Sequence, residues 1–212
     1  MKTIVLAFRW LLALTSQAQD ATYSSSLEAR GSGRMVRETK LVAPFTEIQT
    51  QQFPANITVE VGGSESSVAI NLDDNLRPYL RIDQQNDILK LSFTDSLGKP
   101  FWISQSTMSV TIRTPQLIDF RHGSNSDVLI QGLRGKWFDL AHEANGRVML
   151  RGKVTSFNVV STANGNVGAD ELLTQRANVV STARATVRVN AQDIKEINSG
   201  QGQIINIARG AK

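Results

Sequence analysis

The stretch RHGSNSDVLIQGLRGKWFDL, residues 121–140, is followed by three segments of similar length and pattern: AHEANGRVMLRGKVTSFNV (141–159), VSTANGNVGADELLTQRANV (160–179) and VSTARATVRVNAQDIKEI (180–197). When the four are aligned, apolar residues share columns, and the clearest column holds Val128, Val148, Val167 and Val187. Asparagine and glycine lie just before the first three valines, in SNSD, ANGR and ANGN, and these residue types favour tight turns. The segments therefore predict short strands and turns that recur about every 20 residues.

A period near 20 residues built from strands is typical of solenoid folds. The leucine–asparagine framework of leucine-rich repeats is absent, and a propeller blade needs about twice this length. We therefore predict an all-β fold, a single-stranded parallel β-helix (a solenoid) with coils of about 20 residues stacked about 4.8 Å apart. In this register Val148 and Val167 point into the core. The alternative is a sandwich of antiparallel hairpins in which the spacing is a coincidence.

Short alternating strands continue upstream as far as Leu41, for example NITVEV (56–61), ILKLSF (88–93) and MSVTIRT (108–114). No window carries an apolar stripe at helical spacing over three turns. Alternating β–α units, and with them most nucleotide-binding folds, are therefore not expected. The β-helix domain is predicted to span 41–212, with the coil boundaries in its first half undefined.

The N-terminal residues 1–18 are predicted to be a signal peptide. Lys2 supplies a positive charge, TIVLAFRWLLAL an apolar run, and Ser16-Gln17-Ala18 the small residues that a signal peptidase requires. Arg9 interrupts the apolar run, and the alternative is a short amphipathic helix on a cytosolic protein. Residues 19–40, rich in Ser, Gly and charge, are predicted to be a flexible segment. The mature chain would then be exported to the periplasm, the cell surface or the medium after cleavage near Ala18.

Composition excludes several classes of function. The chain has no cysteine, so it carries no disulfide, thiolate metal site or cysteine nucleophile. Its net charge of +4 includes Lys2 and Arg9, and the remaining +2 is too weak to suggest nucleic acid as a partner. No later apolar run is long enough for a membrane span.

The two histidines, His122 and His142, fall in one column of the aligned segments and could stack on neighbouring coils. The column continues as Ser161 and Ser181, and two histidines without a third ligand make a weak metal site. A solvent-exposed polar ladder is the favoured interpretation. The stretch LDDN (72–75) could hold calcium, but a polar hairpin turn is favoured.

No carboxylate pair suited to sugar cleavage is predicted. Asp119, Asp127 and Asp139 are placed at different phases of the coil, so that no carboxylate column forms. Asp127 and Arg147 share a column and predict a surface ion pair.

Aromatic residues gather in PFW (100–102) and at Trp137 and Phe138. They could form a sugar-stacking platform, but packing at the end of a core is favoured. We accordingly assign no catalytic residue, no cofactor-binding residue, no metal ligand and no cofactor.

Several stretches carry a resemblance to a known family. They are GSGRMVRETKLVAPFTEIQTQ (31–51), ILKLSF (88–93) and SVTIRTPQLIDF (109–120), followed by turns ahead of Val or Ile. With these the chain resembles, over roughly residues 31–207, the head GIN domain family, described as "putative auto-transporter adhesins" of Gram-negative bacteria. The resemblance implies a right-handed parallel β-helix and export. The turns SNSD, EANG, TANG and TARA stand where the family has Ser-Gly-Ser-Gly turns.

Two functions of different classes follow. The leading one is a non-catalytic exported β-solenoid, a cell-surface or envelope adhesin or binding module, whose partners would be surface glycans or envelope proteins. The alternative is a β-helix carbohydrate-active enzyme, a polysaccharide lyase or hydrolase with an unrecognised groove. A groove with two carboxylates within about 10 Å of each other, beside exposed aromatic residues, would favour the enzyme.

Overall fold

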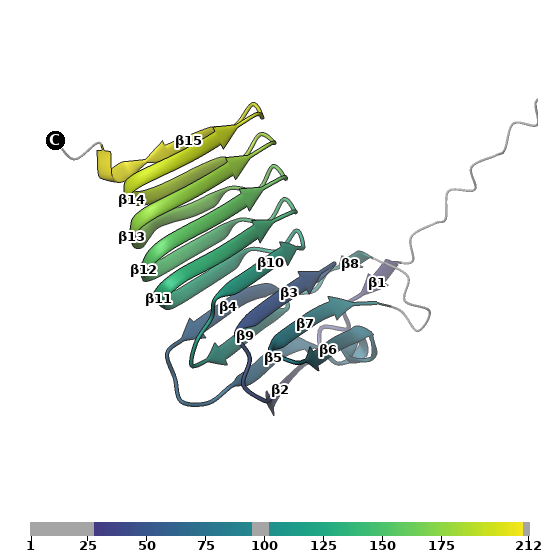
Figure 1. Cartoon of the computed structure of the whole chain (residues 1–212). Helices are drawn as coiled ribbons and strands as arrows, with labels where there is room; N and C mark the ends of the chain where they lie inside the picture. The colour runs from purple at the N-terminus through teal and green to yellow at the C-terminus, as the bar shows by residue number, and fades with distance from the viewer. Residues whose placement is uncertain (1–27, 95–101, 210–212) are drawn as a thin grey trace, which may run out of the picture.

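A computed structural model describes residues 28–94 and 102–209, and this part of the chain consists almost entirely of β-strands (Figure 1). Two short 3₁₀ helices, η1 (Asp74–Tyr79) and η2 (Ile207–Arg209), interrupt them. The strands are β1 (Glu28–Arg30), β2 (Met35–Leu41), β3 (Glu47–Gln51), β4 (Asn56–Val61), β5 (Ser67–Asp73), β6 (Leu80–Gln85), β7 (Ile88–Phe93), β8 (Trp102–Ser104), β9 (Ser109–Thr114), β10 (Asp119–Gly123), β11 (Val128–His142), β12 (Val148–Ser161), β13 (Val167–Ser181), β14 (Thr186–Asn198) and β15 (Gln203–Asn206). None of the helices in these ranges is long and apolar enough to cross a membrane.

The four long strands β11 to β14 lie parallel and side by side, and β15 extends them (Figure 1). Their register pairs Val128 with Val148, Val148 with Val167, and Val167 with Val187. These valines are fully buried because alternate residues of a strand point to opposite faces of the sheet. The alignment of the valine column from the sequence therefore agrees with the register.

Each long strand bends near its middle. In β12 the bend is at Gly152, whose φ is +140° and whose added Cβ would lie 2.1 Å from the Leu133 carbonyl oxygen. Only glycine fits such a backbone and such a close approach. The register also shifts there, between Ile130 and Leu133 of β11. As a result, the two halves of each long strand belong to differently oriented parts of one sheet.

The sheet divides at β11. The C-terminal half of β11 pairs with β10 and leads through β3 and β7 to β6, whereas the N-terminal half pairs with β4 and leads through β9 and β5 to β2. Apolar side chains from both branches and from the long strands form a single core. The 13-stranded sheet therefore curls around this core like half a barrel.

The prediction of a single-stranded right-handed parallel β-helix is wrong. β2 and β5, β5 and β9, and β6 and β7 pair antiparallel, so the sheet is mixed. The reason is local for β6 and β7, because Asn86 and Asp87 form a two-residue turn with Asn86 at a φ of +54°. Such a turn connects antiparallel neighbours. The 20-residue spacing does not extend into the first half of the chain, so it gives no indication of how the strands pair there.

Residues 28–41, placed largely in the predicted flexible segment, contain two strands. β2 pairs antiparallel with β5, and β1 forms a separate two-stranded sheet with β8. Val36 of β2 packs against the core, which gives the segment an anchor that its polar composition concealed. The predicted signal peptide (1–18) lies outside the described residues, as do Pro100 and Phe101.

Candidate functional site

The second halves of β11 to β14 present three rows of outward side chains, one residue from each strand in each row. We call them the tryptophan row, the amide row and the aliphatic row, and together they form the outer face. In strand order the tryptophan row is Trp137, Ser156, Arg176 and Asp193; the amide row is Asp139, Asn158, Asn178 and Lys195; and the aliphatic row is Ala141, Val160, Val180 and Ile197.

The amide row is a directed chain of hydrogen bonds. Asn158 Nδ2 donates to Asp139 Oδ1 at 2.6 Å, and Asn178 Nδ2 donates to Asn158 Oδ1 at 2.7 Å. An ionised carboxylate can only accept, so Asp139 fixes the orientation of Asn158, which in turn fixes that of Asn178. Each amide still has one N–H and one lone pair available to a ligand.

A shallow groove of about 590 Å³ runs between the tryptophan and amide rows, and it is lined mainly by Ser156, Asn158, Arg176, Asn178, Asp193 and Lys195. Ser156 is the small residue between Trp137 and Arg176. The Arg176 Nη2 group lies 3.5 Å from Ser156 Oγ and makes no ion pair with any residue of the described ranges.

Apolar groups border this groove. The exposed fraction is 47% for Trp137, 45% for Val160 and 65% for Ile197. An exposed aliphatic row beside an oriented amide row is a surface that offers both apolar contact and hydrogen bonds. The sequence singled out Trp137 of these residues as a candidate and aligned Ile197 with Leu140, Val159 and Val179. That alignment of Ile197 is wrong by one residue, since Glu196 pairs with Val179 and Ile197 with Val180.

Two carboxylates continue the amide row beyond Asp139 onto neighbouring strands. Asp119 of β10 pairs with Asp139 on one side and with Glu47 of β3 on the other. The expectation that no carboxylate column forms is therefore wrong. Burial raises the pKa of Asp119, with Glu47 and Asp139 adding to this effect and Arg121, at 3.8 Å, opposing it.

His122 and His142 stack as cross-strand neighbours, with ring centroids 5.6 Å apart and planes inclined by 5°. Both rings are buried, so the solvent-exposed ladder expected from the sequence is wrong. The column points into the core, where Ser161 and Ser181 are also fully buried.

The hydrogen bonds of both histidines are satisfied. Nε2 of each ring donates to a turn carbonyl, of Ser126 at 2.8 Å and of Gly146 at 2.7 Å. Nδ1 of His122 then accepts from Thr50 Oγ1 at 3.0 Å. Burial lowers the pKa of His122 to about 4 against the opposing effect of the bond to Ser126, and it also lowers the pKa of His142. These are neutral structural side chains, and no cluster of three or more potential ligands in the described ranges is arranged to hold a metal.

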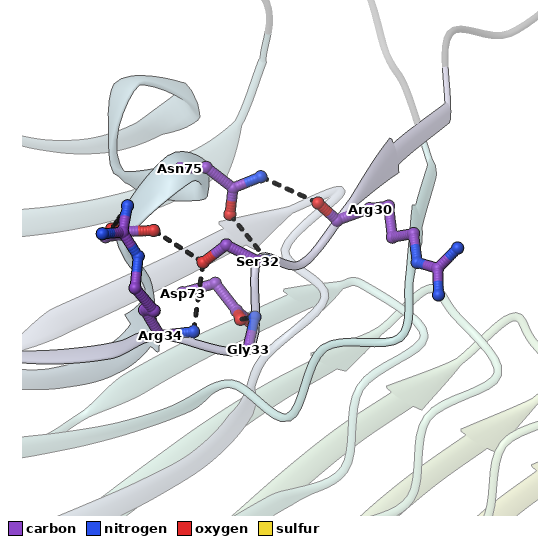
Figure 2. Close-up of polar contacts among 7 residues, drawn as sticks. Arg30, Ser32, Gly33, Arg34, Asp73 and Asn75 are labelled. Carbon is purple, nitrogen blue, oxygen red and sulfur yellow. Dashed lines mark hydrogen bonds and ion pairs between the residues drawn. The ribbon is translucent and has the colours of Figure 1, made fainter.

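The stretch 72–75 binds a backbone turn instead of a cation. Asp73, which is 1% exposed, accepts hydrogen bonds from the Gly33 N–H at 2.7 Å and from the Ser106 hydroxyl. Asn75 Oδ1 accepts from the Ser32 N–H at 3.0 Å (Figure 2). The oxygens that calcium would need are thus directed at the turn 31–34, and we call this contact the turn clamp.

An ion pair completes the turn clamp. Asp74 accepts from Ser32 Oγ and pairs with Arg34 Nη2, each at 2.6 Å. The hydrogen bond from Ser32, together with the Arg34 charge, lowers the pKa of Asp74. The clamp fixes the chain between β1 and β2, which is a structural role.

The ion pair and the aromatic platform considered from the sequence are not formed by the described residues. Asp127 Oδ1 accepts from the Arg147 backbone N–H at 2.9 Å, and no ion pair joins the two side chains. Phe138 is buried and stacks on Phe157 at 6.1 Å, whereas Trp102 is exposed on the two-stranded sheet. Trp137 and Trp102 belong to different sheets and do not form the single platform considered from the sequence.

Solved structures with the same fold exist, although their sequences are distant. One, from Bacteroides fragilis, is described as a "putative adhesin"; it is 16% identical, with a TM-score of 0.60 over 84% of this chain and 99% of that chain. Another, from Parabacteroides distasonis, is described as a "putative lipid binding protein"; it is 12% identical, with a TM-score of 0.50 over 85% of this chain and 99% of that chain. No curated protein sequence matches the chain.

At sequence level, the family described as "Putative auto-transporter adhesin, head GIN domain" matches residues 44–208. This match covers most of the chain and includes β3 to β15, the whole outer face among them. The resemblance seen in the sequence is confirmed. The chain belongs to the head GIN domain family.

Proposed function

We propose that this protein is an exported, non-catalytic binding module of the cell envelope, and that the groove of the outer face holds its ligand. The family description as an adhesin and the adhesin description of the Bacteroides fragilis structure support a binding role. We further propose that the chain is exported through a signal peptide at residues 1–18. An N-terminal segment (19–40) and a binding domain (41–212) follow it. Its partners are surface glycans or envelope proteins.

One observation carries the choice of site: an aliphatic row and an exposed tryptophan flank a groove whose polar side chains are already oriented. Val160 on β12 and Ile197 on β14 expose large parts of their apolar side chains, and Val180 of β13 lies between them. Soluble proteins usually keep such patches small, so a contiguous apolar row beside polar partners marks an interaction surface. The groove thus combines the apolar contact and the few directed polar groups that ligand sites need.

The site can be tested by filling the groove. Ser156→Trp places a large ring on its floor, and Met149→Trp is the matched control because Met149 is an exposed residue on the first half of the same strand. Purified protein is mixed with whole cells and with isolated envelopes, and the retained fraction is measured. We expect retention to fall in Ser156→Trp and to persist in Met149→Trp. Equal retention by both variants would remove the groove from the proposal.

A second function is favoured by one specific observation, the pairing of Asp119 with Asp139. Two carboxyls on neighbouring strands stand about 5 Å apart along the sheet, the separation of the two carboxylates in retaining glycosidases. The raised pKa of Asp119 suits a general acid, and Asp139, which accepts a hydrogen bond from the Asn158 amide, is its neighbouring carboxyl group. Neither residue lines the groove, which places this glycoside hydrolase activity second.

The hydrolase is tested with Asp119→Asn against the control Asp127→Asn, because Asp127 binds only a turn amide. Release of reducing ends from polysaccharides is measured for the parent and both variants. We expect no release by any of the three. Release that is lost only in Asp119→Asn would make the protein an enzyme.

A further inference from the structure

The side chains of the groove point to the chemical class of its ligand. We infer that the groove binds a neutral glycan chain laid across β12 to β14 that extends onto β11, with hydroxyl groups on the amide row and a sugar ring on Trp137, which lies outside the groove lining and pairs with Ser156 at its edge. This inference rests on the proposed function and goes further by naming the ligand.

The first support is the shape of the tryptophan row. Trp137 pairs with Ser156, and Ser156 pairs with Arg176, so a small side chain separates two large ones. With strands about 4.8 Å apart, the backbones of Trp137 and Arg176 stand roughly 10 Å from each other. The Arg176 guanidinium reaches back toward Ser156, with Nη2 at 3.5 Å from Ser156 Oγ, so the indole and the guanidinium come close enough to contact one sugar ring. An indole offers a flat apolar surface to the C–H face of such a ring, and a guanidinium offers a planar set of donors to its hydroxyls.

The second support is the fixed direction of the amide row. Because Asp139 accepts from Asn158 and Asn158 accepts from Asn178, each amide presents its spare donor in a set orientation. The two amides lie on neighbouring strands, about 4.8 Å apart, which is comparable with the length of one unit in an extended glycan. A chain that crosses β12 and β13 would therefore meet an amide at each of two successive sugar units.

Charge decides between neutral and acidic glycans. Within the rows that border the groove, Arg176 and Lys195 are balanced by Asp139 and Asp193. An acidic polymer that approached the two cations would meet Asp193, which pairs with Arg176 and lies two residues from Lys195 on the same strand. A neutral, hydroxyl-rich chain can use donors and acceptors of both kinds without this repulsion.

The position of the groove on a sheet face favours a glycan over an extended peptide as its ligand. A peptide strand binds mainly through backbone groups at an exposed sheet edge. The groove instead lies on a sheet face, and along β12 and β13 its backbone is paired on both sides, so only side chains are available there. The one unpaired backbone edge is Asp193–Asn198 of β14, where the charge of Glu196 in the inward column discourages a further strand.

Isothermal titration of the purified protein tests the inference. The probes are linear hexasaccharides of glucose, mannose, galactose and N-acetylglucosamine, with polygalacturonate as the acidic probe. We expect one or more of the neutral hexasaccharides to bind, and we expect Trp137→Ala and Asn158→Ala each to weaken the Kd about tenfold. Met149→Ala, on the other outward surface of β12, should leave the Kd unchanged, and all variants should keep the melting temperature within a few degrees.

Each other outcome overturns the inference, and the outcomes differ from failure of the proposed function. If the neutral probes do not bind, or bind Trp137→Ala as tightly as the parent, the glycan ligand is wrong. If polygalacturonate binds through Asn158 and the neutral probes do not, the ligand is acidic. If Ser156→Trp also leaves retention on envelopes unchanged, the groove itself is not the site, and both statements fall together.

Discussion

The stacked histidines show how a single side chain can be assigned correctly to a column and wrongly to an environment. Their spacing in the sequence predicts that His122 and His142 are neighbours, and the register confirms it. Whether the column points inward depends on the phase of alternation, and polar residues at 122, 142, 161 and 181 suggest solvent. The core accepts the two histidine rings because the turn carbonyls of Ser126 and Gly146 accept hydrogen bonds from the ring N–H groups.

A pH dependence of stability follows from the buried rings. The pKa of His122 falls from 6.5 in the unfolded chain to about 4 in the folded protein, so the unfolded state binds its proton first as the pH drops. The contribution of the neutral rings to the free energy of unfolding is complete above about pH 6.5, and it is lost as the pH falls from 6.5 to 4. The loss from His122 alone is on the order of 3 kcal/mol.

Urea unfolding at pH 7.5 and pH 5 measures this effect. The double variant His122→Asn, His142→Asn should be less stable at pH 7.5 but should lose much less stability than the parent on acidification. Asp127, which faces His122 electrostatically, is present in both proteins and cancels in the comparison. An equal loss in parent and variant would assign the acid sensitivity to other groups.

Glycine at the turns is required by close contact. An added Cβ at Gly146 would lie 1.9 Å from the Ser126 carbonyl oxygen of the preceding turn, whereas at Gly63 it would meet nothing within 4 Å. We expect Gly146→Ala to destabilise the fold by about 2 kcal/mol or more and Gly63→Ala to change it by less than about 1 kcal/mol. Thermal melts of the two variants compare them directly. A small effect at Gly146 would mean that adjacent turns can separate.

At the scale of elements, alternation along β12 sets which positions tolerate charge. Val148 is fully buried between Val128 and Val167, and the adjoining Met149 is exposed. Val148→Asp buries an uncompensated charge and should cost several kcal/mol, enough to prevent folding. Met149→Asp should cost less than about 1 kcal/mol. Soluble yield and melting temperature decide between them, and the reverse order would contradict the register.

The edge of β14 carries its own protection against pairing. β15 pairs only with Thr186–Val189, so within the described ranges the stretch Asp193–Asn198 has a partner on one side alone. Glu196 occupies the inward column of Val159 and Val179, and an inward charge on an edge strand discourages a further strand.

Removing this charge should therefore promote self-association. We expect Glu196→Val to form concentration-dependent oligomers or aggregates in sedimentation velocity. Gln192→Val, on the same strand and also exposed, adds the same side chain outside that column and should leave the sedimentation coefficient unchanged. If both variants sediment like the parent, something other than the charge of Glu196 prevents a further strand from pairing at this edge.

For the whole molecule, the sequence predicts the strands and the register of its second half but not the architecture. The valines at 128, 148, 167 and 187 are visible because each cross-strand neighbour lies one segment further along the chain. Pairing of β2 with β5, or of β10 with β3, joins segments with no shared pattern, so composition gives no sign of it. Asp119 and Asp139 lie 20 residues apart, the same offset as His122 and His142, so the different phases assigned to them were wrong although the spacing indicated their pairing. Only the pairing of Asp119 with Glu47 joins segments without a shared pattern.

The turn clamp holds the N-terminal strands to the rest of the molecule. Asp73→Ala removes the acceptor of the Gly33 N–H and should release the turn 31–34. We expect trypsin to cleave this variant rapidly after Arg30 or Arg34 while β11–β14 stay intact, and to cleave the parent slowly there. Glu65→Ala, in the exposed loop between β4 and β5, is the control and should match the parent. Equal cleavage rates would show that β2–β5 pairing alone is sufficient.

The order of the strands also has a mechanical consequence. β2 and β15 lie at opposite ends of the stack of strands (Figure 1), so a force that pulls them apart acts along the hydrogen bonds between strands. Such a load breaks each ladder progressively instead of shearing all its bonds at once. β15, with four residues paired to β14, is the first to detach. A protein held at one end and bound through the proposed groove would thus lengthen one strand at a time under load.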